Sequence, residues 1–95
     1  MKKPVVHRDD KYLAFIRGLT CCVCDRPGPN EAHHTSKRTG GMGMKGSDYR
    51  AVPYCAWHHL TRHNDGVETF EREYAIDERE IVISCLENYV AGGNE

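Results

Sequence analysis

Two short stretches of this chain carry cysteine and histidine at the spacing of metal ligands. Cys21 and Cys24 are separated by two residues, and Cys55 and His58 have the same separation. In a Cys-x-x-Cys turn both thiolates can face one point while backbone N–H groups support the sulfurs. Together the four residues make a Cys₃His set, which is typical of a closed, tetrahedral structural zinc site. Such a site would help a small chain to fold, because binding of structural zinc contributes folding free energy.

A redox dithiol is the alternative interpretation of Cys21 and Cys24. That motif normally opens a helix in a thioredoxin-like fold, whereas proline and glycine follow here at positions 27–29. Cys22 and Cys85 stand outside the Cys₃His set. We expect both to be buried or half-buried and to pack as small apolar residues.

Histidines next to these ligands suggest a second, open metal site. His59 and His63 are four residues apart, so a helix would place them on one face. His33 and His34 are adjacent, and on a strand they would point in opposite directions. We therefore expect His33 and His59 as ligands, His63 as a candidate third ligand, and His34 left as a base, which is a hydrolytic arrangement. A second structural metal, or no metal and plain surface histidines, are the alternatives.

The elements that must position these residues can be predicted from periodicity and turn signals. Residues 9–17 and 67–74 predict short helices, and Asp77 with Glu80 predicts a capping box that opens a helix ending before the glycines at 92–93. Residues 32–35 and 50–54 predict strands, residues 36–47 a glycine-rich basic loop, and residues 56–63 a helix. Within that helix we expect Trp57 to pack in the core beneath the zinc ligands, and Arg62 to face solvent or DNA.

Composition and charge bound the class of protein. The chain has 95 residues, 39% of them hydrophobic, which fits one α+β domain over 1–95 with a core that needs reinforcement. The opening MKKPVVHRDDKY has no apolar run and no stretch could span a membrane, so we expect a cytoplasmic protein with zinc rather than disulfides. Residues 26–64 hold six basic and two acidic side chains, whereas residues 65–95 hold two and nine. A phosphate-bearing partner is expected at the middle segment.

The combined pattern over residues 12–63 resembles the HNH nucleases, which are ββα-metal (His-Me finger) enzymes. The resemblance is nearest to the phage-encoded Ref-like recombination-enhancement group, in which a GGMG-type loop separates the histidine pair from an aspartate. The residues that carry it are His33, His34, Asp48, Pro53, Cys55, His58, His59 and His63. The implied fold is a small zinc-stapled ββα core over about 20–64, preceded by a helix and followed by C-terminal helices over about 67–91.

The resemblance also implies roles for the residues. His33 and His59 would bind the catalytic metal, His63 matches a third ligand of some members, and His34 would be the general base. Asp48 takes the place of the residue that braces the loop and orients the base, although it stands farther before Pro53 than in many members. Lys37, Arg38, Lys45 and Arg50 are the basic residues available to bind phosphate.

The expected function is metal-dependent hydrolysis of DNA by a one-metal mechanism, in phage or prophage recombination or DNA processing. The expected cofactors are structural Zn²⁺ and a catalytic divalent metal, Mg²⁺ or Mn²⁺, with Zn²⁺ or Ni²⁺ as alternatives. The expected partner is DNA, whether duplex, branched or single-stranded, with a recombinase as a further candidate, no membrane, and a monomer or homodimer. The rival interpretation is a non-catalytic zinc module that binds DNA or a protein, and it would not depend on His34.

Overall fold

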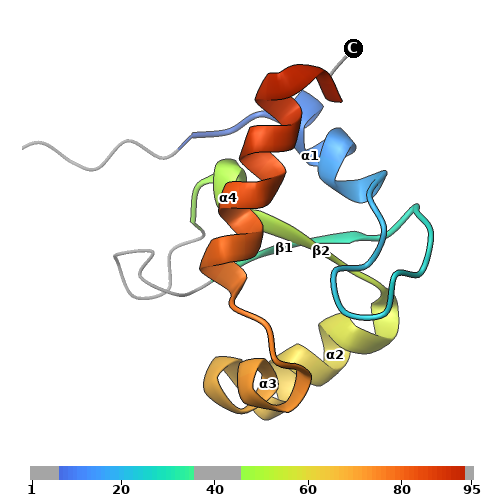
Figure 1. Ribbon diagram of the computed structural model, residues 1–95, viewed down its shortest axis with the longest axis vertical. Helices are drawn as coiled ribbons and strands as arrows, with labels where there is room; N and C mark the ends of the chain where they lie inside the picture. Colours follow the sequence, from blue (N-terminus) through green and yellow to red (C-terminus); the bar gives the residue numbers. More distant parts are fainter. Residues whose placement is uncertain (1–6, 36–45, 94–95) are drawn as a thin grey trace, which may run out of the picture.

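The computed structural model describes residues 7–35 and 46–93. Over these ranges the chain forms an α+β fold with one two-stranded sheet and four α-helices (Figure 1). The elements in chain order are α1 (Asp10–Arg17), β1 (Glu31–His34), the 3₁₀ turn η1 (Asp48–Arg50), β2 (Ala51–Tyr54), α2 (Ala56–Asp65), α3 (Val67–Tyr74), α4 (Glu78–Asn88) and the π-helical turn η2 (Tyr89–Gly93).

The sheet is antiparallel and sets the two adjacent histidines on its two faces. His33 lies opposite Val52 and His34 lies opposite Ala51. All four residues of β2 are buried, whereas β1 is exposed at Glu31 and buried at His33. Successive side chains of a strand point to opposite faces. β1 is therefore the more exposed of the two strands, and β2 lies in the interior.

The helices enclose the sheet from two ends. α4 runs across the sheet toward α1, and α2 and α3 lie together at the opposite end (Figure 1). Two apolar clusters result. One joins the cysteine turn to β2, α3 and α4, and the other joins α1 to the start of β2 and to α4; their buried members are Cys21, Val52, Tyr54, Cys55, Phe70 and Val82 in the first, and Tyr12, Leu13, Ile16, Ala51 and Cys85 in the second.

The predicted elements are present, with small shifts at their ends. Asp9 precedes α1 as its N-cap, since its side chain accepts a hydrogen bond from the Tyr12 amide. Asp77 caps α4 by accepting from the Arg79 amide, while Glu80, the expected partner in the capping box, is exposed. The acidic residue that turns inward in the first turn of α4 is Glu78 instead.

Glu78 is the centre of a buried polar network that the sequence did not predict. Its side chain is fully buried and accepts hydrogen bonds from Thr35 Oγ1 at 2.5 Å, Tyr54 OH at 2.5 Å and Arg62 Nε at 2.7 Å. Arg62 is itself 5% exposed. The expectation that Arg62 faces solvent or DNA is therefore wrong, because its guanidinium forms a buried ion pair with the Glu78 carboxylate of α4.

Trp57 is also placed differently from the expectation. Its side chain is 68% exposed, so Trp57 is not part of the core. Leu60, on the same helix, is 57% exposed. The inward face of α2 is taken by His58, whose ring contacts Phe70 and Tyr74, and by Arg62. Cys22 is half-buried and Cys85 is buried, as expected. Among the described residues, no helix is long and apolar enough to cross a membrane.

Candidate active site and metal centres

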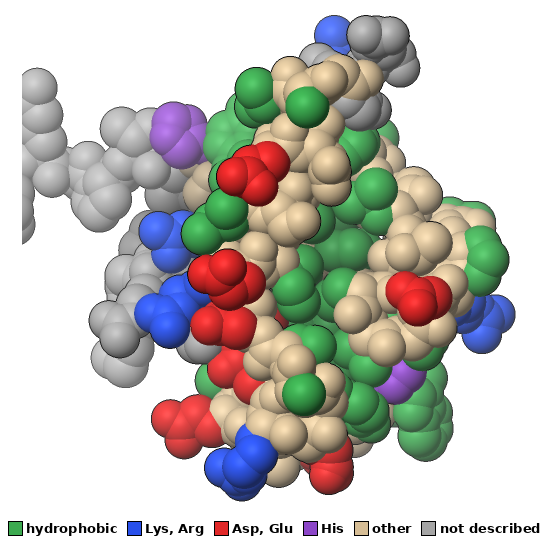
Figure 2. All heavy atoms as spheres, in the orientation of Figure 1, with side chains coloured by type: hydrophobic (Ala, Val, Ile, Leu, Met, Phe, Trp, Pro, Cys, Tyr) green, Lys and Arg blue, Asp and Glu red, His purple; other side chains and the backbone are tan. Residues whose placement is uncertain are grey.

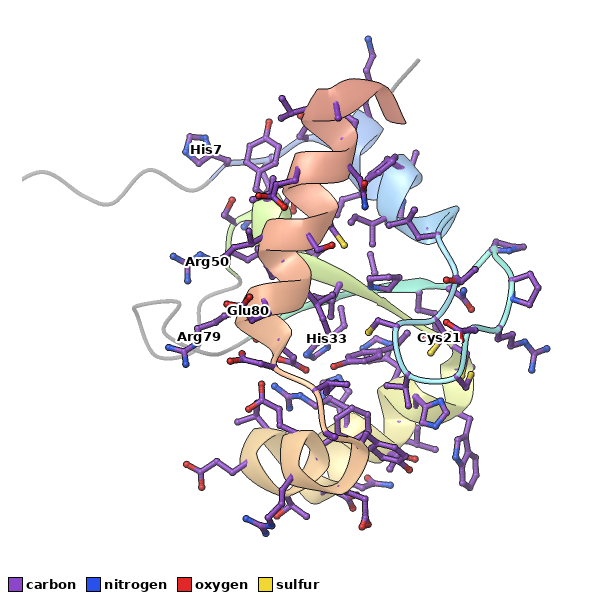
Figure 3. The ribbon with its side chains drawn as sticks, viewed as in Figure 1. His7, Cys21, His33, Arg50, Arg79 and Glu80 are labelled. Atoms are coloured by element: carbon purple, nitrogen blue, oxygen red, sulfur yellow. The ribbon has the colours of Figure 1, made fainter. Side chains whose placement is uncertain are left out.

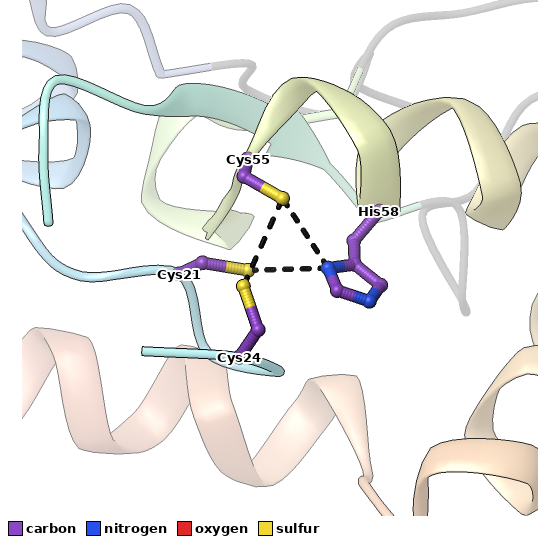
Figure 4. A group of neighbouring side chains, drawn as sticks. All are labelled: Cys21, Cys24, Cys55 and His58. Carbon is purple, nitrogen blue, oxygen red and sulfur yellow. Dashed lines mark hydrogen bonds between the residues drawn. The ribbon is translucent and has the colours of Figure 1, made fainter. Parts of the chain in front are cut away.

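The first candidate metal centre joins the cysteine turn to the start of α2. Cys21, Cys24, Cys55 and His58 bring their ligand atoms within 4.8 Å of one another (Figure 4). The Sγ atoms of Cys24 and Cys55 are 3.9 Å apart, and His58 Nδ1 lies 3.2 Å from Cys55 Sγ and 3.9 Å from Cys21 Sγ. Tetrahedral zinc with a Zn–S bond of about 2.3 Å separates neighbouring sulfurs by about 3.8 Å and a sulfur from a nitrogen by about 3.6 Å. The cluster is compatible with a structural zinc ion.

Local backbone contacts hold this cluster in shape. The Cys21 amide donates to the Arg26 carbonyl, and the Cys22 amide donates to the Pro53 carbonyl, which ties the turn to β2. Burial alone would raise the pKa of Cys21, but backbone N–H groups, that of Cys55 foremost, hold the pKa below its ordinary value. A lowered pKa favours the thiolate, which is the form that binds zinc.

The second cluster lies between β1 and α2. The ligand nitrogens of His33, His59 and His63 fall within 4.8 Å of one another, and His33 points from the sheet toward α2 (Figure 3). His33 Nδ1 is 3.1 Å from His59 Nε2. Two nitrogens bound tetrahedrally at about 2.05 Å would be about 3.3 Å apart, so the pair has the separation of metal ligands. Burial lowers the pKa of His33 to about 4, so this imidazole is neutral and able to bind a metal at pH 7.

The outer nitrogens of the two facing rings differ. His59 Nδ1 is 2.6 Å from Glu31 Oε1. Nε2 of His33 is buried and has no hydrogen-bond partner among the residues that the structure describes. Metal-binding histidines usually donate their second N–H to an outer partner. Glu31 is thus a candidate functional residue that sequence reasoning missed, although its position two residues before His33, on the same strand face, could have indicated it.

His34 is held by Asp48, as the motif predicted. His34 Nε2 is 2.7 Å from Asp48 Oδ1, and Asp48 is almost fully buried. Its second oxygen accepts from the Asp9 amide at 2.7 Å, and Arg8 Nη1 lies 3.4 Å from the first. Burial would raise the pKa of Asp48, but these hydrogen bonds, that from His34 foremost, hold the pKa below its ordinary value. In a neutral imidazole, donation of the Nε2–H to the ionised carboxylate leaves the lone pair on His34 Nδ1.

The histidine cluster and His34 share one open pocket of about 390 Å³. It lies between β1, α1 and α2; its lining residues are Leu13, Arg17, Ala32, His33, His34, His59 and His63. Arg17 is the lining residue with a permanent positive charge, and nothing in its local sequence pointed to this position. The Arg17 guanidinium gives the pocket a group that can bind an anion.

The predicted phosphate-binding residues are only partly described. Arg50 is exposed on η1 and projects outward from the body of the protein (Figure 3). Lys37, Arg38 and Lys45 lie outside the described residues. On the face shown in Figure 2, acidic side chains spread over α3 and α4, in agreement with the negative balance of residues 65–95.

Comparison with known proteins places the chain in a family without an assigned activity. Residues 1–93 match the family described as "Protein of unknown function (DUF968)". The chain belongs to the DUF968 family. A relative of the chain is the "Uncharacterized protein YdfU" of Escherichia coli (strain K12), which is 30% identical over 95 residues. The alignment covers 98% of this chain and 27% of that relative, so the DUF968 chain spans about a quarter of the relative's length. No solved structure matches this chain.

Proposed function

We propose that this DUF968 chain is a metal-dependent DNA endonuclease of the ββα-metal type. One observation carries the proposal. A histidine oriented by a buried carboxylate opens onto the same pocket as a cluster of three histidines at metal-binding distances. A positioned base beside an open metal is the arrangement that hydrolyses phosphodiesters at neutral pH.

The chain's own residues can each be given a step. When bound by His33, His59 and His63, a divalent cation would supply Lewis acidity to a phosphate and to the leaving oxygen. His34 Nδ1 accepts a proton from the attacking water, and Asp48 stabilises the imidazolium that forms. Arg17 stands at the edge of the pocket, where a guanidinium can bind a phosphate oxygen. Three imidazoles suit Zn²⁺ or Ni²⁺ better than Mg²⁺ or Mn²⁺, which prefer oxygen ligands.

The charge distribution supports a nucleic acid approaching from the β1 side. Most of the residues that line the pocket belong to the basic segment 26–64, Arg17 adds a positive charge from α1, and acidic side chains lie over α3 and α4 on the face shown in Figure 2. Processing of recombination intermediates in a phage or prophage, with a recombinase as partner, is the biological setting that we propose by resemblance.

A plasmid assay tests the function. Zinc-loaded protein should convert supercoiled DNA to nicked or linear forms only when Mn²⁺, Ni²⁺, Zn²⁺ or Mg²⁺ is added. His34→Ala should lower the rate by about 10²–10⁴-fold while DNA binding persists. His7→Ala is the matched control, because His7 is an exposed histidine outside the pocket. Intact plasmid with every metal, under conditions where the protein binds DNA, would rule the nuclease out.

The rival function is a zinc module that binds without cutting. Exposed Trp57 and Leu60 on α2 favour it, because exposed aromatic and apolar side chains are common at binding surfaces. This rival predicts one tightly bound zinc per chain and DNA or protein binding that is unchanged in His34→Ala.

A further inference from the structure

We propose that Glu31 is a positioning residue of the histidine cluster: its carboxylate fixes the tautomer of His59 and aims Nε2 of that ring at Nδ1 of His33. The use of the cluster to bind a catalytic cation rests on the proposed function. The positioning itself rests on contacts of the described residues.

The strand and the helix bring the three side chains together. Glu31 and His33 are two residues apart on β1 and therefore share a face of the sheet, the face that α2 approaches with His59. Glu31 Oε1 is 2.6 Å from His59 Nδ1, and His59 Nε2 is 3.1 Å from His33 Nδ1. One imidazole of α2 thus bridges a carboxylate and a second imidazole.

The chemistry of these atoms assigns the proton. An ionised carboxylate can accept hydrogen bonds but cannot donate them. A hydrogen bond to ionised Glu31 therefore requires a hydrogen on His59 Nδ1. In a neutral ring this leaves the lone pair on Nε2, which faces His33. A carboxylate behind a histidine ligand raises the basicity of the ligand nitrogen and keeps the ring in its orientation.

A carboxylate also holds the candidate base His34, but it pairs with Nε2 of that ring instead of Nδ1. His34 gives its Nε2–H to Asp48 and keeps the Nδ1 lone pair, whereas His59 gives its Nδ1–H to Glu31 and keeps the Nε2 lone pair. Two carboxylates on separate elements therefore set the tautomers of two histidines in one pocket. The pairing with Glu31 prepares His59 to bind a cation, and the pairing with Asp48 prepares His34 to accept a proton.

The test measures tautomer and metal affinity in the zinc-loaded chain. Long-range ¹H–¹⁵N spectra of the imidazoles, recorded without added metal, should show His59 protonated at Nδ1 in the wild type and shifted toward the Nε2–H form in Glu31→Ala. Calorimetric titration with Mn²⁺ and with Ni²⁺ should show about 10–100-fold weaker binding in Glu31→Ala. Glu31→Gln should recover part of the loss, because its amide oxygen still accepts the Nδ1–H. Glu68→Gln, an exposed residue of α3, is the control and should match the wild type.

The outcomes separate this inference from the nuclease proposal. The role of Glu31 is overturned if His59 of the wild type is protonated at Nε2. It is also overturned if Glu31→Ala binds Mn²⁺ and Ni²⁺ with an affinity within twofold of the control. Failure of the wild type to bind either ion also overturns it. If Glu31→Ala weakens metal binding as expected while wild-type protein leaves plasmid intact, Glu31 keeps its role and the nuclease proposal fails.

Discussion

The two candidate metal centres share helix α2 but differ in what surrounds their ligands. In the Cys₃His cluster, ligands from the cysteine turn and from the start of α2 face one another, with the turn hydrogen-bonded to β2 behind them. In the histidine cluster, the ligands come from β1 and α2 and line an open pocket with His34. A closed set of four ligands stabilises a fold, whereas an open set leaves coordination positions for a substrate. Adjacent residues of one helix, His58 and His59, thus belong to centres of different kinds.

The two centres are linked by the network around Glu78. Thr35 follows His34, Tyr54 precedes Cys55 and Arg62 precedes His63, and all three side chains bind the Glu78 carboxylate. One buried charge from α4 therefore holds the strand ends and the helix that carry the histidine cluster and also Cys55 and His58 of the Cys₃His cluster. Substitutions at either centre, or in the network around Glu78, can separate the roles of the two centres.

Cys55→Ser should have the largest effect, because it removes a ligand of the closed centre. Loss of structural zinc removes on the order of 10 kcal/mol of folding free energy, which exceeds what a domain of this size can lose. We expect a chain without bound zinc, unfolded by circular dichroism. Cys22→Ala, which lies outside the cluster, should keep one zinc and a folded spectrum. A folded Cys55→Ser protein would show that the closed centre is not what holds the domain.

Glu78→Gln tests the link between the centres. Removing one charge of a buried pair leaves Arg62 uncompensated and should cost about 3–5 kcal/mol in the free energy of unfolding. Chemical denaturation measures it, with the exposed Glu80→Gln as the matched control. Equal stability of the two variants would show that the network contributes nothing beyond an apolar core.

Low pH should weaken the network around Glu78. Burial would raise the pKa of Glu78, but hydrogen bonds from Arg62, Thr35 and Tyr54 hold the pKa below its ordinary value. A lowered folded-state pKa gives stabilisation that is complete above the unfolded value, about 4.3, and is lost as the pH falls through the folded value. The difference in unfolding free energy between wild type and Glu78→Gln should therefore be constant from pH 7 to 5 and should narrow below about pH 4.

Asp48→Asn tests the orientation of the base at the open centre. The neutral amide no longer fixes the His34 tautomer, and we expect DNA cleavage to slow by about 10²-fold with one zinc still bound. Cleavage rates with added Mn²⁺ measure the effect. Asp10→Asn, at the exposed first turn of α1, should cut at the wild-type rate. An unchanged rate in Asp48→Asn would remove Asp48 from the mechanism.

Trp57→Ala should have the smallest effect on stability. Its side chain is 68% exposed, so the change in unfolding free energy should stay within about 0.5 kcal/mol. Phe70→Ala is the contrast, because Phe70 is fully buried in the cluster around the zinc ligands, and should cost about 3–5 kcal/mol. A large loss in Trp57→Ala would place this ring in the core after all.

The pairs of residues within the two clusters could be predicted because their spacing is local, and the structure brings the pairs together. Two Cys-x-x-ligand turns need only short segments, and the i, i+4 pair on a helix needs only helical periodicity. The Asp48–His34 contact came from resemblance, and the structure brings the two side chains to hydrogen-bond distance. The elements were found for the same local reason.

The remaining features depend on partners that are distant in the sequence. Arg62 looked like a surface cation because Glu78, its partner, lies on another helix and stands one residue after the expected cap. Trp57 was assigned to the core from its residue type, yet its position on α2 faces away from the residues that pack inward. The Glu31–His59 contact joins a strand to a helix, and only the alternation of β1 hinted at it.

We propose that α2 carries ligands of one centre that holds the fold and of another that cuts DNA. Plasmid cleavage by zinc-loaded wild type and His34→Ala, with zinc content measured on the same samples, tests it most directly. We expect one zinc in both proteins, cleavage by the wild type with added divalent metal, and a loss of about 10²–10⁴-fold in the cleavage rate of the variant. Equal cleavage by the two proteins, or none by a wild type that binds DNA, would contradict it.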